Sequence, residues 1–127
     1  MMTNLACIML GSMLGGAARY FISGVAARRF GETFPWGTLL INVSGALIIG
    51  GLGALAAADP ARIASSPWLF AVTGFLGCYT TVSSFSLQTL ALARDGESGR
   101  AAGYVALSVA LCLAAVAAGF SAISVLR

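Results

Sequence analysis

The amino-acid sequence predicts an all-α membrane protein with four transmembrane helices in a single domain, residues 1–127. Apolar residues make up 59% of the chain and charged residues only 9%, and the mean hydropathy is +0.95. Soluble domains carry about 25% charged residues. The apolar residues fall in four stretches, each long enough for the ~20-residue helix that crosses a bilayer. We therefore expect a multi-pass protein of the cell's inner (plasma) membrane.

Charge and composition exclude several function classes. The net charge of +3 is small and dispersed, which argues against a nucleic-acid surface. The chain contains no His, so neither a haem anchor nor a His-based metal site is expected. Its three cysteines lie in apolar segments without paired spacing and are interpreted as small hydrophobic residues rather than as a disulfide or metal framework.

The first two apolar stretches are expected to form helices over residues 5–25 and about 36–58. No basic segment precedes the first stretch, so we interpret it as a retained transmembrane helix rather than a signal peptide. The second stretch follows Pro35, and proline suits the first turn of a helix.

The third and fourth helices are expected over residues 68–93 and 101–125. Pro60 and Pro67 bound the polar break that precedes the third. A charged, glycine-containing turn at residues 94–100 separates it from the fourth.

The most unusual segment is residues 74–86, GFLGCYTTVSSFS, in the middle of the third stretch. It holds five hydroxyl side chains, one tyrosine and two glycines. An apolar helix has no local need for so many hydroxyls, whereas a hydrogen-bonding surface inside the membrane does. The glycines also favour backbone released from regular helix. We therefore expect the third helix to be broken at its centre.

Small residues recur along the first, second and fourth stretches, and in lipid such stripes mark closely packed faces. Four short helices enclose little volume, so we expect a homo-oligomer. The arginines of the polar breaks and of the C-terminus divide four against two between the two sides of the membrane. This is a weak positive-inside signal, which permits insertion in both orientations and an antiparallel dimer.

Polar side chains within the spans each have two interpretations. Arg19 lies near the end of the first predicted helix, either as an interfacial residue beside Tyr20 or at the mouth of an anion pathway. Asn42 makes either an interhelical hydrogen bond or part of a lined path. Tyr104 and Ser108 form a stripe with Cys112 at i, i+4 and i+8, although Ser108 alone could bond a helical carbonyl.

No Asp or Glu lies in any predicted span. Proton-coupled exporters of cations need a membrane carboxylate that binds cation and proton in turn. The remaining groups are neutral hydrogen-bond donors, aromatic rings and one arginine, and aromatic ring edges carry positive potential. This chemistry favours a small anion.

Three motifs in order make the sequence resemble the Fluc/CrcB family of fluoride channels. They are Gly15-Gly16-x-x-Arg19-Tyr20, Pro35-Trp36-Gly37-Thr38-Leu39-x-x-Asn42-x-x-Gly45, and Gly74-Phe75-x-Gly77-x-x-Thr80-Thr81-x-Ser83-x-Phe85-Ser86. The resemblance covers nearly the whole chain. It implies an antiparallel, dual-topology homodimer with two pores that exports cytoplasmic fluoride passively, without enzymatic activity.

The resemblance also implies roles for individual residues. The backbone carbonyls of Gly77 and Thr80 would hold a structural Na⁺ on the dimer axis, and Arg19 would lie near the vestibule. The pore would be lined by residues that match the family's asparagine, phenylalanine and polar track: Asn42, Phe85, Tyr104 and Ser108, with contributions from Thr81 and Ser83.

Val82 departs from the family pattern, because it replaces the first of two phenylalanines whose ring edges face fluoride. This substitution adds an alternative to a working channel. The chain could be a pore-impaired channel or a partner subunit of one. A small dual-topology multidrug exporter is the other alternative, and the missing carboxylate weighs against it.

Overall fold

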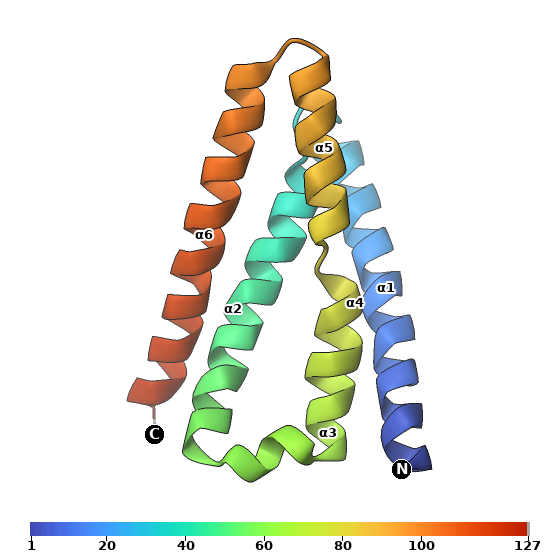
Figure 1. Ribbon diagram of the computed structural model, residues 1–127, viewed down its shortest axis with the longest axis vertical. Helices are drawn as coiled ribbons and strands as arrows, with labels where there is room; N and C mark the ends of the chain where they lie inside the picture. The colour runs from blue at the N-terminus through green and yellow to red at the C-terminus, as the bar shows by residue number, and fades with distance from the viewer. Residues whose placement is uncertain (127) are drawn as a thin grey trace.

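The computed structural model describes residues 1–126, and it is helical throughout, with short connections (Figure 1). Helix α1 is Met2–Phe30 and α2 is Trp36–Ala58, followed by the short 3₁₀-helix η1, Pro60–Ala64. The last helix is α6, Ser98–Val125. Glycines with positive φ, Gly31 and Gly96, stand in the turns after α1 and α5, where a side chain would be strained.

The third span is built from four consecutive helical segments. They are α3 (Ser66–Trp68), the π-helix η2 (Leu69–Leu76), α4 (Gly77–Tyr79) and α5 (Val82–Arg94). Between α4 and α5, Thr80 and Thr81 have extended backbone, with φ/ψ of −78°/160° and −153°/123°. Figure 1 shows this connection as a short non-helical segment near the middle of the molecule.

Four helical spans are long and apolar enough to cross a membrane, as the sequence predicts: Met2–Phe30, Trp36–Ala58, Ser66–Arg94 and Ser98–Val125. The first extends further than expected at its C-terminal end, to Phe30. As a result, Arg19 lies well inside α1 rather than near its end.

Glycines bring the helices together in two pairs. A Cβ at Gly15 would overlap the Phe75 carbonyl, so α1 and η2 meet backbone to backbone. The pair α2 and α6 meets in the same way, because Gly50 lies on Val116 and Gly119 lies on the Leu47 carbonyl. Association in lipid depends on such close approach.

The buried core of the single chain is small. Ile41, Leu76 and Tyr79 form its one cluster among the described residues, with a few half-buried apolar neighbours. Many large apolar side chains on all four spans are exposed instead. Their surfaces suit contact with lipid or with another protein chain.

Candidate functional site

Asn42 binds both backbone groups of Thr81. Its Nδ2 donates to the Thr81 carbonyl at 2.9 Å, and its Oδ1 accepts from the Thr81 N–H at 2.8 Å. In an uninterrupted helix that N–H would point to the carbonyl of Gly77, four residues earlier. Asn42 therefore takes the place of a helical hydrogen bond and holds the connection between α4 and α5 in its extended form.

The Thr81 side chain begins α5. Its hydroxyl accepts a hydrogen bond from the Ser84 N–H at 3.2 Å, which is the usual role of threonine at a helix N-cap. The same oxygen lies 3.1 Å from the Ser83 hydroxyl, and Ser83 is itself exposed. Thr81 is 6% exposed, and its hydroxyl also donates to Ser84 Oγ at 3.2 Å.

Arg19 donates from Nη1 to the carbonyl oxygen of Thr80 at 3.4 Å. This contact places the guanidinium beside the connection between α4 and α5, at the middle of the spans. Neither interpretation made from the sequence, an interfacial position or the mouth of a pathway, includes this contact. Whether Arg19 also serves a vestibule stays a prediction.

The carbonyls at this connection fit the chemistry of a hard monovalent cation, which prefers oxygen ligands. The normal helical donor to the Gly77 carbonyl is redirected to Asn42, and the Thr80 carbonyl follows extended backbone. No cluster of His, Cys, Asp or Glu that could hold a metal occurs in residues 1–126. The sequence-based assignment of the Gly77 and Thr80 backbone oxygens as Na⁺ ligands stays a prediction.

An open groove of about 510 Å³ lies against the connection. We call it the central groove. Its polar lining consists of Asn42, Thr80, Thr81 and Ser108, and its walls are mainly apolar. Ser108 is 6% exposed, and its hydroxyl has no hydrogen-bond partner. A buried polar atom without a partner is costly, so a ligand or water is expected at this point of the groove.

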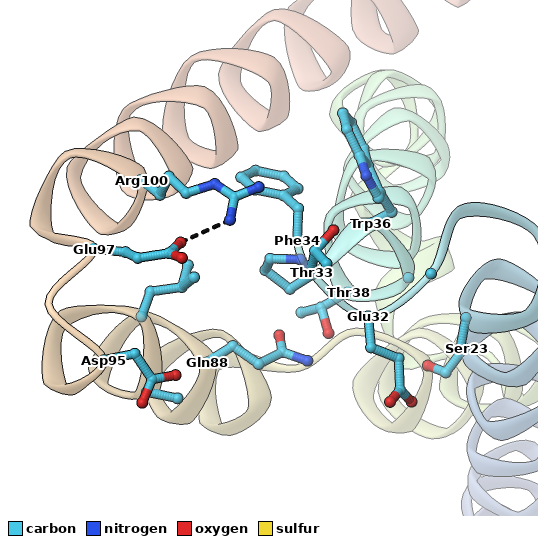
Figure 2. Close-up of a pocket in the computed structure, with 16 residues that line it drawn as sticks. Ser23, Glu32, Thr33, Phe34, Trp36, Thr38, Gln88, Asp95, Glu97 and Arg100 are labelled. Carbon is cyan, nitrogen blue, oxygen red and sulfur yellow. Dashed lines mark hydrogen bonds and ion pairs between the residues drawn. The ribbon is translucent and has the colours of Figure 1, made fainter.

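A second cavity, of about 480 Å³, opens where the α1–α2 turn meets the α5–α6 turn. We call it the vestibule, although Arg19, the residue predicted to lie near a vestibule, is not among its lining residues. Figure 2 shows Gln88 of α5 and Thr38 of α2 extending toward each other in it, with Glu97 and Arg100 paired at its side. Their ion pair measures 2.7 Å.

Tyr104 lies between the two cavities along α6. One turn before it, Arg100 lines the vestibule, and one turn after it, Ser108 lines the central groove. Tyr104 is fully buried, and its hydroxyl donates to Gln88 Oε1 at 3.2 Å. Gln88 was not among the residues singled out from the sequence, because a glutamine near the end of a span is a common surface residue.

Two aromatic rings pack against Tyr104, one from each cavity. Phe85 lies 5.2 Å away between ring centroids, tilted by 45°, and lines the groove. Phe34 packs edge-on at 5.4 Å and lines the vestibule. Val82 lines the groove but is 76% exposed, so it lies at the open side of the groove.

Comparison with known proteins identifies the family. Residues 6–120 match the family described as CrcB-like protein, Camphor Resistance (CrcB). The chain belongs to the CrcB family. It is 67% identical to "Fluoride-specific ion channel FluC 2" of Bradyrhizobium diazoefficiens, over 94% of this chain and 88% of the relative. It is also 62% identical to "Fluoride-specific ion channel FluC 2" of Rhodopseudomonas palustris, over 97% and 95% of the two chains.

A third CrcB-family relative, "Fluoride-specific ion channel FluC" of Methylocella silvestris, is 54% identical over 86% of this chain and 84% of its own. These matches confirm the family resemblance seen in the sequence. The relatives are ion channels rather than enzymes. The pore, vestibule and cation roles of individual residues stay predictions.

Proposed function

We propose that this protein is a fluoride-selective ion channel through which cytoplasmic fluoride leaves the cell down its electrochemical gradient. The relatives named above are fluoride-specific ion channels, and the chain is similar to them over nearly its whole length. The central groove offers neutral donors to an anion. All four acidic residues of the sequence lie between the spans, so no carboxylate repels an anion there.

The observation that carries this proposal is the unpartnered hydroxyl of Ser108. Fluoride is small and strongly hydrated, so its water must be replaced by close donors during passage. The Ser108 hydroxyl is buried and free to donate. Asn42, Thr81 and Phe85 line the same groove, and Tyr104 adjoins it. Ser83 and Val82 complete the set of pore residues proposed from the sequence.

A single chain leaves the central groove open, so we propose an antiparallel, dual-topology homodimer with one groove per chain. The exposed apolar surfaces of the spans support a second copy as the cover. Val82, on the open side of the groove, would then face that copy. The dimer would contain two separate pores.

A structural Na⁺ would be held by the carbonyls of Gly77 and Thr80 from both copies. The ion would supply positive charge that offsets carbonyl oxygens brought together without helical donors. Asn42 supports the site because its Oδ1 accepts the Thr81 N–H, which would otherwise bond the Gly77 carbonyl. Arg19 also donates a hydrogen bond to the Thr80 carbonyl. If Na⁺ binds there, thermal stability of the purified protein should rise with Na⁺ concentration but not with an equal concentration of a bulky cation.

Fluoride efflux from liposomes containing only this protein tests the proposed function. The native protein should release fluoride but not chloride. Ser108→Ala should slow efflux by about tenfold, the size expected when a buried donor is lost. Ser86→Ala is the matched control, because Ser86 is exposed and bonds its own helix. Absence of efflux from folded native protein would overturn the proposal.

One observation favours a second candidate, a partner subunit of a mixed channel. Val82 supplies no ring at the open side of the groove, where the family pattern has phenylalanine. A copy from another chain could contribute that ring. Efflux that appears only after addition of a second CrcB-family chain would support this alternative.

A further inference from the structure

Cys112 differs from the other two cysteines in its position. It lies one turn after Ser108 on α6 and lines the central groove. Cys7 and Cys78 are also half-buried and unpaired but line neither the groove nor the vestibule. The described chain therefore has one thiol directed to the candidate anion path.

Ser108 provides independent evidence that this part of the groove accepts a ligand. Its hydroxyl is buried and has no hydrogen-bond partner, although it lines the same cavity. The cavity holds about 510 Å³, enough for a small molecule beside both side chains. A group bound to Cys112 would therefore lie next to the donor that the proposed function assigns to fluoride.

The lining around Cys112 decides which reagent fits. Val109 and Val116 lie about one turn before and after Cys112 on α6, and Ile49 of α2 lines the same groove. These side chains are apolar and give no counter-charge, so a neutral reagent is favoured over a charged one. Among the groove-lining residues the thiol is the one soft ligand, and soft thiols select soft metals.

We propose that Cys112 is a soft-metal modification site at which neutral mercury(II) chloride binds and closes the groove. The Cys112 S–H bond and one Hg–Cl bond break, and an S–Hg bond forms. The proton leaves with the displaced chloride, giving S–Hg–Cl and HCl without a change in oxidation state. The adduct can be tested by itself, whereas its effect on flux rests on the proposed fluoride function.

The test compares two cysteine variants reconstituted in liposomes. The first variant carries Cys7→Ser and Cys78→Ser and keeps Cys112. The second carries Cys112→Ser and keeps the other two thiols. Each is treated with mercury(II) chloride, adducts are located by mass spectrometry, and fluoride efflux is recorded before and after treatment. Excess dithiothreitol should reverse the reaction by competing for the metal.

We expect a mercury adduct on Cys112 in the first variant and a fall in efflux of about tenfold or more, because the adduct would occupy the proposed path beside Ser108. Treatment with mercury(II) chloride should change fluoride efflux through the second variant by less than about twofold. Adding Ser108→Ala to the first variant should leave the Cys112 adduct intact, because the S–Hg bond does not involve the Ser108 hydroxyl.

Three results would overturn the inference: no adduct on Cys112, an adduct that leaves efflux unchanged, or equal inhibition of the Cys112→Ser variant. Failure of the proposed function gives a different result. In that case the adduct forms on Cys112, but the untreated protein shows no fluoride efflux, and the metal site itself still stands.

Discussion

The two halves of the third span differ in how they are held. The first half, from α3 to α4, packs against α1 and buries Gly74, Leu76 and Tyr79. The second half, α5, buries none of its residues. Nevertheless α5 contributes Phe85 to the central groove and Gln88 to the vestibule.

The first half of the third span therefore anchors it against α1, whereas the second half, α5, lines the two cavities. Close backbone contact fixes the first half, and elements with few buried contacts open at lower free energy. Between the two halves, Asn42 and Arg19 hold the extended residues Thr80 and Thr81 from outside the span. We infer that the site is positioned by α1, α2 and the anchored half, whereas α5 adapts to whatever covers the groove.

The largest effect is expected from breaking the anchor. Gly15→Ala places a methyl group onto the Phe75 carbonyl, and the atoms it meets belong to backbone that cannot easily move. The free energy of unfolding should fall by about 1–3 kcal/mol, as for other overpacked sites. Thermal unfolding in detergent measures this change.

Gly16→Ala is the control for Gly15→Ala. A Cβ at Gly16 meets no atom within 4 Å, and alanine favours the helix by up to ~1 kcal/mol. Its stability should be unchanged or slightly higher. Equal destabilisation by both substitutions would mean that the anchor is not a matter of close packing.

The next largest effect is expected at the junction of the two halves. Asn42→Ala removes both hydrogen bonds to Thr81 and leaves a buried N–H and carbonyl unpaired. Each lost hydrogen bond lowers the free energy of unfolding by about 0.5–1.5 kcal/mol. Stability and fluoride efflux should therefore fall together, which thermal unfolding and liposome efflux record on the same samples.

Ser44→Ala separates stability from flux. Ser44 lies near Asn42 on α2 but bonds the Tyr79 hydroxyl, at 2.8 Å, in the anchored half. This variant should lose stability and keep most of its efflux. If Ser44→Ala abolishes efflux as completely as Asn42→Ala, the division between anchoring and lining is wrong.

The sequence anticipated the spans because apolar length and polar breaks are local properties. It also singled out the hydroxyl-rich segment, where Thr81 begins α5. It could not foresee that Asn42 binds the Thr81 backbone, because that pairing joins residues on different spans. Its two interpretations of Asn42, a structural bond and a path, are both compatible with this contact.

Arg19 and Gln88 also show that contacts between helices could not be predicted from the sequence. Arg19 was noticed as a charge in an apolar stretch, but its contact with Thr80 depends on how α1 meets the third span. Gln88 was overlooked because its significance comes from Tyr104, on another helix. Partner identity across helices is a tertiary property, and residue type alone does not encode it.

A smaller effect should come from the rings that α5 presents. Val82→Phe adds a ring edge at the open side of the groove, and such contacts are worth ~0.5–1.5 kcal/mol. Fluoride efflux should rise by about twofold to tenfold, as that energy range implies. Phe85→Ile should lower efflux in the Val82 background, since it removes the ring beside Tyr104. If neither substitution alters efflux, ring edges do not contribute to the path.

The smallest effect is expected at the rim of the vestibule. Glu97 pairs with Arg100 at 2.7 Å, and the two side chains are 42% and 49% exposed. Such surface pairs contribute about 0–1 kcal/mol, so Glu97→Gln should leave stability nearly unchanged. The substitution does remove a negative charge from the vestibule and leaves Arg100 unpaired, and both changes favour an approaching anion.

Fluoride efflux through Glu97→Gln should therefore rise by less than about twofold at low ionic strength, and the gain should vanish in ~1 M salt, where screening acts within ~3 Å. Asp59→Asn is the matched control. Asp59 pairs with Arg62 at 3.3 Å with similar exposure, but neither residue lines the vestibule. A salt-dependent gain in Asp59→Asn as well would show that net charge, rather than the vestibule, controls access. A gain confined to Glu97→Gln would locate the anion's approach between the α1–α2 turn and α5, the loosely held half of the third span.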